Sequence, residues 1–275
     1  MNSISKSFGD IVIFDEIEFD FLNKCTLVIG ENGSGKTTLM KILSGLTKSY
    51  SGKCNIKDKT SLLLDSNMLY LYKSGIENLN LFLNDDEKLE AHRLIELFEM
   101  DDYINKRCIS YSNGMRKKLS IVIALSRKKD YLLLDEPTNS LDTKTIKVLI
   151  DILVERKKHQ KIVISSHDMQ IFDKKLIDEV FMIKNKKLYS KKLTEYDFDY
   201  YKVKTYKEIS EFRYKFEQLD DYYIFKINTN DVLTFSKELS EYLILEMIKI
   251  EPYDGLYLKE LYRWKNKYWM LFIHL

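Results

Sequence analysis

The sequence predicts an α/β fold with a mixed sheet at its core, followed by a small α+β domain. Two short apolar runs, Tyr131 to Asp135 and Lys161 to Ser165, are bounded by polar residues, as is typical of strands buried on both faces of a sheet. Between them, residues 143–158 carry apolar side chains at helical spacing, which completes a strand, helix, strand unit. After about residue 195 the composition changes, since 12 of the 19 tyrosines lie in residues 196–275.

The 275 residues suffice for one large domain and one small one. We expect the large domain over residues 1–195, with a helical subdomain at about 66–125, and the α+β domain over residues 196–275. In the smaller domain the run YYIFKIN, which begins at Tyr222, alternates as a strand does. Hydrophobic residues make up 45% of the chain and charged residues 31%, which excludes a disordered or fibrous protein.

Charge and cysteine content bound the partners and the compartment. The 44 basic and 42 acidic side chains leave a formal charge of +2, so no global field favours nucleic acid or an anionic membrane as the main partner. The three cysteines have no CxxC spacing, which favours a reducing cytosol over a disulfide framework or a zinc site. No export signal is visible, and no apolar run reaches the roughly 20 residues of a spanning helix. We therefore expect any membrane to be crossed by another chain.

A glycine-rich loop follows the apolar run KCTLVIG and precedes a helical pattern. From Gly30 to Thr37 it satisfies the G-x4-GK-[ST] pattern, in which backbone N–H groups surround the phosphates of a nucleotide. Lys36 is expected to reach the β- and γ-phosphates, and the Thr37 hydroxyl to bind Mg²⁺. The residues of this loop that we expect to bind ATP are Asn32, Gly33, Ser34, Gly35, Lys36, Thr37 and Thr38.

Two carboxylates, Asp135 and Glu136, stand at the end of the apolar run YLLLD and are followed by Pro137. Ligands of open α/β sheets bind at the carboxyl ends of strands. We therefore expect Asp135 to bind Mg²⁺ and Glu136 to face the water that attacks the γ-phosphate.

Taken together, the motifs resemble those of the ABC (ATP-binding cassette) ATPases. The runs ENGSGKTT, YSNGM, YLLLDEPTNSLD and SSHD occur in that family's order and at its approximate spacings, within roughly the first 195 residues. The resemblance implies that Ser112 and Gly114 close on the γ-phosphate bound by a second subunit. It also implies that His167 orients the attacking water, that Phe8 stacks on adenine, and that the loop 140–142 communicates between the subunits.

The chain departs from the family's pattern at two places. Where the family usually has a glutamine that contacts Mg²⁺ and the membrane domain, backward alignment from GIENL places Asp65 or Ser66. A carboxylate at this place is similar to the self-immunity branch of lantibiotic and bacteriocin transporters, and would make Asp65 a metal ligand. In the signature, Tyr111 and Asn113 replace the usual Leu and first Gly, and YSNGMRKKL resembles exporters of the ABC-2 type.

The resemblance implies an ATPase that uses ATP and Mg²⁺ to power export of an amphipathic antimicrobial peptide or drug. Its partners would be a transmembrane permease and a second ATP-binding subunit, either identical or a close paralogue, and no nucleic acid is expected. It would lie in the cytoplasm on the inner face of the membrane. One alternative is a non-transport ABC ATPase acting as an assembly factor, and another is a ribosome-associated one. For the C-terminal run RWKNKYWMLFIHL, packing on the small domain is favoured over contact with a partner subunit or a membrane interface.

Overall fold

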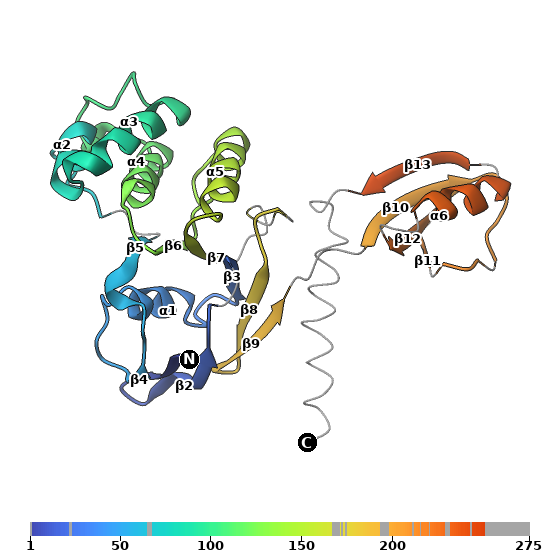
Figure 1. Cartoon of the computed structure of the whole chain (residues 1–275), viewed down its shortest axis with the longest axis horizontal. Coiled ribbons are helices and arrows are strands. Elements are labelled where there is room, and N and C mark those ends of the chain that lie inside the picture. The colour runs from blue at the N-terminus through green and yellow to red at the C-terminus, as the bar shows by residue number, and fades with distance from the viewer. Residues whose placement is uncertain are drawn as a thin grey trace. The chain divides into compact units, whose positions relative to one another are not determined.

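The computed structural model of the chain is shown in Figure 1. The residues that it describes are 2–21, 24–64, 68–166, 171, 173, 175–192, 198–210, 212–214, 216–219, 221–228, 232–242 and 244–250. The chain divides after Lys192 into two compact units, whereas the sequence places the boundary at residue 195.

The centre of the first unit is a six-stranded sheet in the order β5-β6-β7-β3-β8-β9. Its strands are β3 (Cys25–Gly30), β5 (Thr60–Leu63), β6 (Tyr131–Asp135), β7 (Lys161–Ser165), β8 (Glu179–Lys184) and β9 (Lys187–Lys192). Neighbours from β5 to β8 run parallel and only the edge strand β9 runs antiparallel, which confirms the mixed sheet. The bounds of β6 and β7 are those predicted from their apolar runs. Parallel strands buried on both faces tolerate such uninterrupted apolar sequences.

A smaller antiparallel sheet, in the order β2-β1-β4, belongs to the same unit. Its strands are β1 (Asn2–Phe8), β2 (Ile11–Phe19) and β4 (Ser51–Lys53). Its apolar residues join one core with the central sheet, and the Phe19 ring packs edge-on against Phe181 of β8 at a centroid distance of 6.3 Å. Helix α1 (Lys36–Leu43) follows β3 directly and buries Leu39, Met40, Ile42 and Leu43 in that core.

Among the described residues, three α-helices lie between β5 and β6 in the chain and form a group in Figure 1, away from β2 and β4. They are α2 (Gly75–Phe82), α3 (Asp85–Leu97) and α4 (Asn113–Ser126). Helices α2 and α3 begin with capping boxes, formed by Ser74 with Glu77 and by Asn84 with Glu87. Each box satisfies the N–H groups of its own two residues, and this local pattern marks where both helices begin. Helix α5 (Thr143–Arg156) connects β6 to β7 and is capped by Asp142.

The second unit has a four-stranded antiparallel sheet in the order β11-β12-β10-β13. Its elements are β10 (Phe198–Thr205), β11 (Phe216–Leu219), β12 (Tyr222–Asn228), α6 (Val232–Leu239), a 3₁₀ turn (Ser240–Tyr242) and β13 (Ile244–Ile250). Aromatic rings fill its core, with Phe225 and Phe235 at a centroid distance of 5.0 Å. The run RWKNKYWMLFIHL lies outside the described residues.

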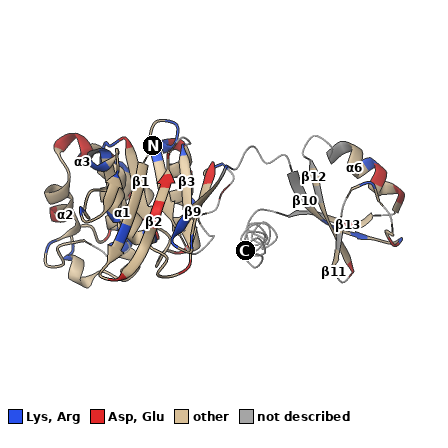
Figure 2. Cartoon of the chain, turned by 90° about the horizontal axis from the view of Figure 1, so that it is seen from below, with Lys and Arg blue, Asp and Glu red and all other residues tan. Residues whose placement is uncertain are grey.

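Along the first unit, Lys and Arg positions are interspersed with Asp and Glu positions (Figure 2), in line with the chain's formal charge of +2. Within the part of the chain that the structure describes, no helix has the length and apolarity that crossing a bilayer requires.

Candidate active site

The glycine-rich loop joins the carboxyl end of β3 to the first turn of α1. Gly33 and Gly35 have φ values of 81° and 104°, which L-residues with side chains rarely adopt. A Cβ atom on Gly35 would lie 2.7 Å from Cγ2 of Ile13 and 2.9 Å from the Phe14 ring, so the loop packs closely against β2. The helix begins at Lys36, and its first N–H groups have no partner inside the helix. This geometry gives the loop the character of an anion-binding site.

The side chain of Lys36 lies inside the loop and is only 7% exposed. Its Nζ donates hydrogen bonds to the carbonyl oxygens of Gly30, at 2.9 Å, and Glu31, at 3.3 Å. It also lies 3.9 Å from Oε1 of Glu136. A buried ammonium group needs such partners, and their positions keep its charge at the centre of the site.

Asp135 is fully buried, and both of its carboxylate oxygens accept hydrogen bonds. Oδ2 accepts from the Thr37 hydroxyl at 2.8 Å, and Oδ1 accepts from the hydroxyl of Ser165 at the end of β7. The register of the sheet explains the second contact, because Ser165 pairs with Asp135 on one side and with Val28 of β3 on the other. The ends of β3, β6 and β7 therefore meet around one carboxylate.

Glu136 follows directly and has a φ of 47°. A left-handed conformation costs a glutamate free energy and often marks a functional site. The Glu136 amide donates to the Ser165 carbonyl oxygen at 3.0 Å, which holds this turn against β7. The Glu136 carboxylate is thereby kept 3.9 Å from Lys36 instead of in solvent.

The residues present fit ATP and Mg²⁺. The Ser34 hydroxyl is buried in the loop and has no hydrogen-bond partner among the residues that the structure describes, so it is available to a phosphate oxygen. The Thr37 hydroxyl and Asp135 carboxylate lie 2.8 Å apart, and oxygen atoms of these two kinds are the ligands that Mg²⁺ prefers.

The predicted signature residues lie at the start of α4. Ser112 is its N-cap, and the Ser112 hydroxyl accepts from the Met115 amide at 3.2 Å. A Cβ atom on Gly114 would lie 2.7 Å from the carbonyl oxygen of Ser140, whose φ is 65°. The structure therefore brings the signature close to the loop 140–142 of the same chain.

Comparison with known proteins supports an assignment to one family. The sequence matches the ABC transporter family over residues 15–139. It is 30% identical over 185 residues to the uncharacterized ABC transporter ATP-binding protein YybJ of Bacillus subtilis, covering 60% of this chain and 83% of YybJ. It is 33% identical over 176 residues to the ABC transporter ATP-binding protein NatA of the same species, covering 57% of this chain and 71% of NatA. The chain belongs to the ABC transporter ATP-binding proteins.

The fold of this ABC protein agrees with that assignment. A structure described as the ATP-binding subunit of an ABC transporter matches it with a TM-score of 0.63 at 20% identity, covering 70% of this chain and 89% of the other. The dimeric post-hydrolysis state of the cassette MJ0796, bound to ADP and Pi, matches with a TM-score of 0.62 at 18% identity, covering 70% and 99%. The ABC cassette fold and the enzyme class of ABC ATPases, expected from the motifs, are confirmed.

Among the other predicted residues of the ABC protein, the structure describes Phe8 and Thr38. Phe8 ends β1 and is 54% exposed, and Nζ of Lys6 lies 4.2 Å from the centroid of its ring. Thr38 is the third residue of α1. His167, Asp65 and Ser66 lie outside the described residues.

Sequence reasoning missed Ser165 as a member of the site. The available signal was its place as the polar last residue of the apolar run KIVIS. Its contact with Asp135 depends on which strands are neighbours in the sheet, and that is not visible in the run itself.

Proposed function

We propose that this ABC protein hydrolyses ATP as one of two ATP-binding subunits and thereby powers export of an amphipathic molecule, such as an antimicrobial peptide or a drug, through a separate permease. The observation that carries the hydrolytic part is the convergence of Lys36, Thr37, Asp135 and Glu136 at the carboxyl ends of β3 and β6. These side chains supply a cation, a hydroxyl and two carboxylates within one small site.

In this proposal each side chain has a separate task. Lys36 exchanges its bonds to the loop carbonyls for bonds to the β- and γ-phosphates. Thr37 and Asp135 would hold Mg²⁺, which would neutralise charge on the phosphate oxygens. Glu136 orients the attacking water and accepts its proton, since its carboxylate is held at the same edge of the sheet. His167, on the strength of the resemblance alone, helps to orient the water.

A second subunit completes the site. Ser112 is exposed at the start of α4. In this chain the same helix start lies against the loop 140–142, which Gly114 approaches closely. An exposed helix N-terminus attracts anions, so Ser112 and Gly114 are suited to a γ-phosphate held by another copy. Closure of two chains around two nucleotides would let hydrolysis drive the permease by a population shift. MJ0796, which has a similar fold, is dimeric.

An exposed apolar strip supports a permease as the partner. Its residues are Met68, Tyr70, Leu71, Tyr72 and Ile109, with exposed fractions between 39% and 77%. The Ile109 amide donates to the Leu71 carbonyl oxygen at 2.7 Å, so the two parts of the strip lie side by side. Exposed apolar patches mark interaction surfaces. Docking there would hold the protein on the inner face of the cell membrane, and the resemblance of YSNGMRKKL to ABC-2 exporters supports export.

The hydrolytic part is tested with Glu136→Gln and Lys36→Ala. Glu136→Gln should bind ATP with Mg²⁺, hydrolyse it at least about a hundredfold more slowly and sediment as an ATP-dependent dimer. Lys36→Ala should lose ATP binding. Hydrolysis by Glu136→Gln at the native rate would disprove the role of Glu136.

The transport part is tested in cells that lack this chain. Such cells should become sensitive to an amphipathic antimicrobial peptide, and the native chain should restore resistance while Glu136→Gln should not. A tagged chain should also purify with a multi-spanning membrane protein, and Tyr72→Glu should weaken that association. Unchanged sensitivity together with no membrane protein in the purified complex would favour a non-transport ATPase.

A further inference from the structure

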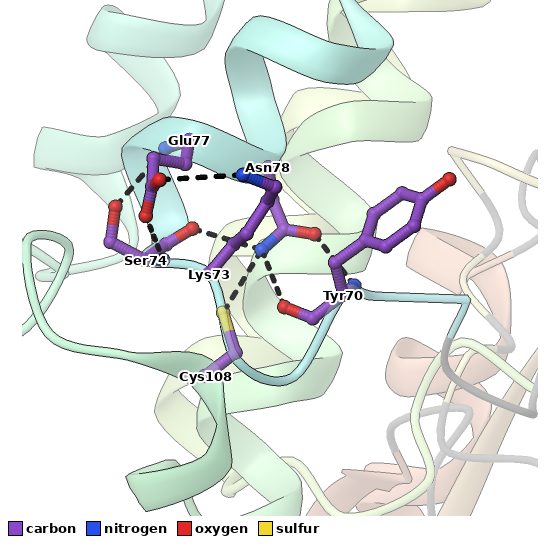
Figure 3. Close-up of polar contacts among 6 residues, drawn as sticks. All are labelled: Tyr70, Lys73, Ser74, Glu77, Asn78 and Cys108. Atoms are coloured by element: carbon purple, nitrogen blue, oxygen red, sulfur yellow. Dashed lines mark hydrogen bonds and ion pairs between the residues drawn. The ribbon is translucent and has the colours of Figure 1, made fainter.

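Asn78 is a fully buried amide in α2 whose side chain bonds to backbone atoms of Tyr70 and Ser74 and to the sulfur of Cys108, all outside the helix (Figure 3). Its Oδ1 accepts from the Tyr70 amide at 2.8 Å, and its Nδ2 donates to the Tyr70 carbonyl oxygen at 3.1 Å. Nδ2 also lies 2.9 Å from the Ser74 carbonyl oxygen and 3.4 Å from Sγ of Cys108. The side chain therefore binds both backbone polar groups of Tyr70 and also contacts a segment 30 residues further along the chain.

The loop of residues 70–74, which precedes α2, is also hydrogen-bonded through its backbone to the segment that contains Cys108. Cys108 begins a 3₁₀ turn, η2 (Cys108–Ser110), and its amide donates to the Lys73 carbonyl oxygen at 2.8 Å. The next amide, of Ile109, donates to the Leu71 carbonyl oxygen at 2.7 Å. Residues 70–74 and 107–109 thus run together, with Asn78 packed against both.

The distant segment leads directly to the signature serine. Arg116 of α4 donates from Nε to the Cys108 carbonyl oxygen at 3.1 Å and from a terminal nitrogen to the Ile109 carbonyl oxygen at 3.0 Å. Tyr111, the residue before Ser112, is 3% exposed, and its hydroxyl donates to the Tyr103 carbonyl oxygen at 2.7 Å. Side chains on both sides of Ser112, those of Tyr111 and Arg116, are therefore bonded to the segment 103–109.

Asn78 is not required to begin α2. The Ser74 hydroxyl accepts from the Glu77 amide at 3.1 Å, and the Ser74 amide donates to Oε2 of Glu77 at 2.7 Å. This capping box already satisfies the start of the helix. The contacts of Asn78 with Tyr70 and Cys108 therefore serve a different purpose.

We infer that Asn78 is a positioning residue for ATP hydrolysis: it holds the loop 70–74 against η2 and so fixes Ser112 at the start of α4. The inference rests on the proposed function, in which Ser112 contacts the γ-phosphate bound by a second subunit. It adds that the buried Asn78 amide, together with the two backbone hydrogen bonds from Cys108 and Ile109, holds the apolar strip and the signature as one piece. Asn78 itself contacts neither the glycine-rich loop nor Asp135 in the described structure.

The experiment is a double-mutant cycle of Asn78→Ala and Ser112→Ala, with ATP hydrolysis and ATP binding measured separately. Asn78→Ala should lower kcat by about tenfold. The Kd for ATP with Mg²⁺ should change by less than about twofold, because the substitution leaves the glycine-rich loop unchanged. In the Ser112→Ala background, Asn78→Ala should cause no further loss, because two residues that act through one contact are not additive. Asn80→Ala, at an exposed position of the same helix, is the matched control and should keep the native kcat.

The outcomes separate this inference from the proposed function. Native hydrolysis by Ser112→Ala would remove the role of the signature serine, and with it the proposed function. If Ser112→Ala slows hydrolysis and the two effects multiply in the double mutant, Asn78 acts elsewhere and only the inference is overturned.

A second measurement needs no substitution and stands even if Asn78→Ala does not fold. Addition of ATP with Mg²⁺ to the native chain should slow hydrogen exchange at the Met115 amide, which is bonded to Ser112 Oγ. The Tyr70 and Ile109 amides should slow with it if the three segments form one piece. Slowing at Met115 without any change at Tyr70 and Ile109 would overturn the inference.

Discussion

The Thr37 hydroxyl donates a hydrogen bond of 2.8 Å to Oδ2 of Asp135, joining the start of α1 to the end of β6 across 98 positions of sequence. The other oxygen of that carboxylate accepts from Ser165. Asp135 is fully buried, and a buried carboxylate is costly unless donors satisfy its oxygens. Its position at the expected metal site is therefore set from two sides.

Ser165→Ala should lower both stability and hydrolysis. The substitution leaves Oδ1 of Asp135 without its hydroxyl donor, which costs about 1–3 kcal/mol of unfolding free energy. We also expect a fall in kcat, because the carboxylate that would hold Mg²⁺ keeps its bond to Thr37 but loses the second hydroxyl that positions it. Urea unfolding and steady-state phosphate release measure the two effects.

Ser61→Ala is the control for that prediction. Ser61 is also fully buried, and its hydroxyl donates to the Ala124 carbonyl oxygen at 2.7 Å, away from the site. It should lose comparable stability and retain native hydrolysis. Native hydrolysis by Ser165→Ala as well would show that Ser165 has no part in the site.

Part of this site can be predicted from local sequence patterns, and part depends on contacts between segments far apart in the chain. The bounds of β6 and β7, and hence the position of Asp135 at a strand end, follow from local apolar runs and a motif of fixed spacing. The contact of Ser165 with Asp135 depends on the register of two strands joined by α5, and local patterns do not contain it. Asn78 is a single amide in GIENL, and only the tertiary fold shows that it meets Cys108.

Gly114→Ala should slow hydrolysis. Alanine normally stabilises a helix by about 1 kcal/mol relative to glycine. Here its Cβ would lie 2.7 Å from the Ser140 carbonyl oxygen, and a backbone atom cannot rotate away. The clash should shift the signature or the loop 140–142 and lower kcat by about tenfold or more. ATP binding should be retained, because the glycine-rich loop is unchanged.

Gly45→Ala provides the comparison for Gly114→Ala. Gly45 has a φ of 79°, so alanine is strained there, but its Cβ would meet only Lys57, at 3.4 Å. This variant should lose stability and keep its kcat. Calorimetry and phosphate release distinguish the two variants, and equal kcat values for both would contradict the importance of the Gly114 contact.

The ion pair between Glu90 of α3 and Arg156 of α5 should make stability depend on pH. The pKa of Glu90 is lowered mainly by its hydrogen bond with Arg93 and further by the charge of Arg156, against the opposing effect of burial. A lowered pKa contributes stability above the ordinary glutamate pKa of 4.5, and this contribution is lost as the pH falls through the lowered value.

Glu90→Gln, which cannot ionise, tests the direction in which stability changes with pH. It should be about 1 kcal/mol less stable than the native chain at pH 7, and the difference should shrink as the pH falls below 4.5. Glu155→Gln, at an exposed pair with Lys158, is the control and should show a smaller difference throughout. Urea unfolding between pH 7 and pH 3 provides the measurement, and a difference for Glu90→Gln that stays constant would contradict the expectation.

Phe8→Ala tests whether the exposed ring at the end of β1 binds adenine. Stacking of a base on an aromatic ring is worth about 1–3 kcal/mol, so the Kd for ATP should rise by about tenfold. Because Phe8 is 54% exposed, removal of its ring should cost little stability. Inorganic tripolyphosphate has no base, so its affinity should not change.

The two ligands separate stacking from damage to the loop. If Phe8→Ala weakens the binding of tripolyphosphate as much as the binding of ATP, the substitution has disturbed the glycine-rich loop, and the ring does not act by stacking on the base. Phe8→Tyr keeps an aromatic face and should restore ATP affinity, whereas Leu46→Ala, at another exposed apolar position, should leave both affinities unchanged. Equal ATP affinity for Phe8→Ala and the native chain would exclude Phe8 as the adenine platform and leave its ring to the contact with Lys6.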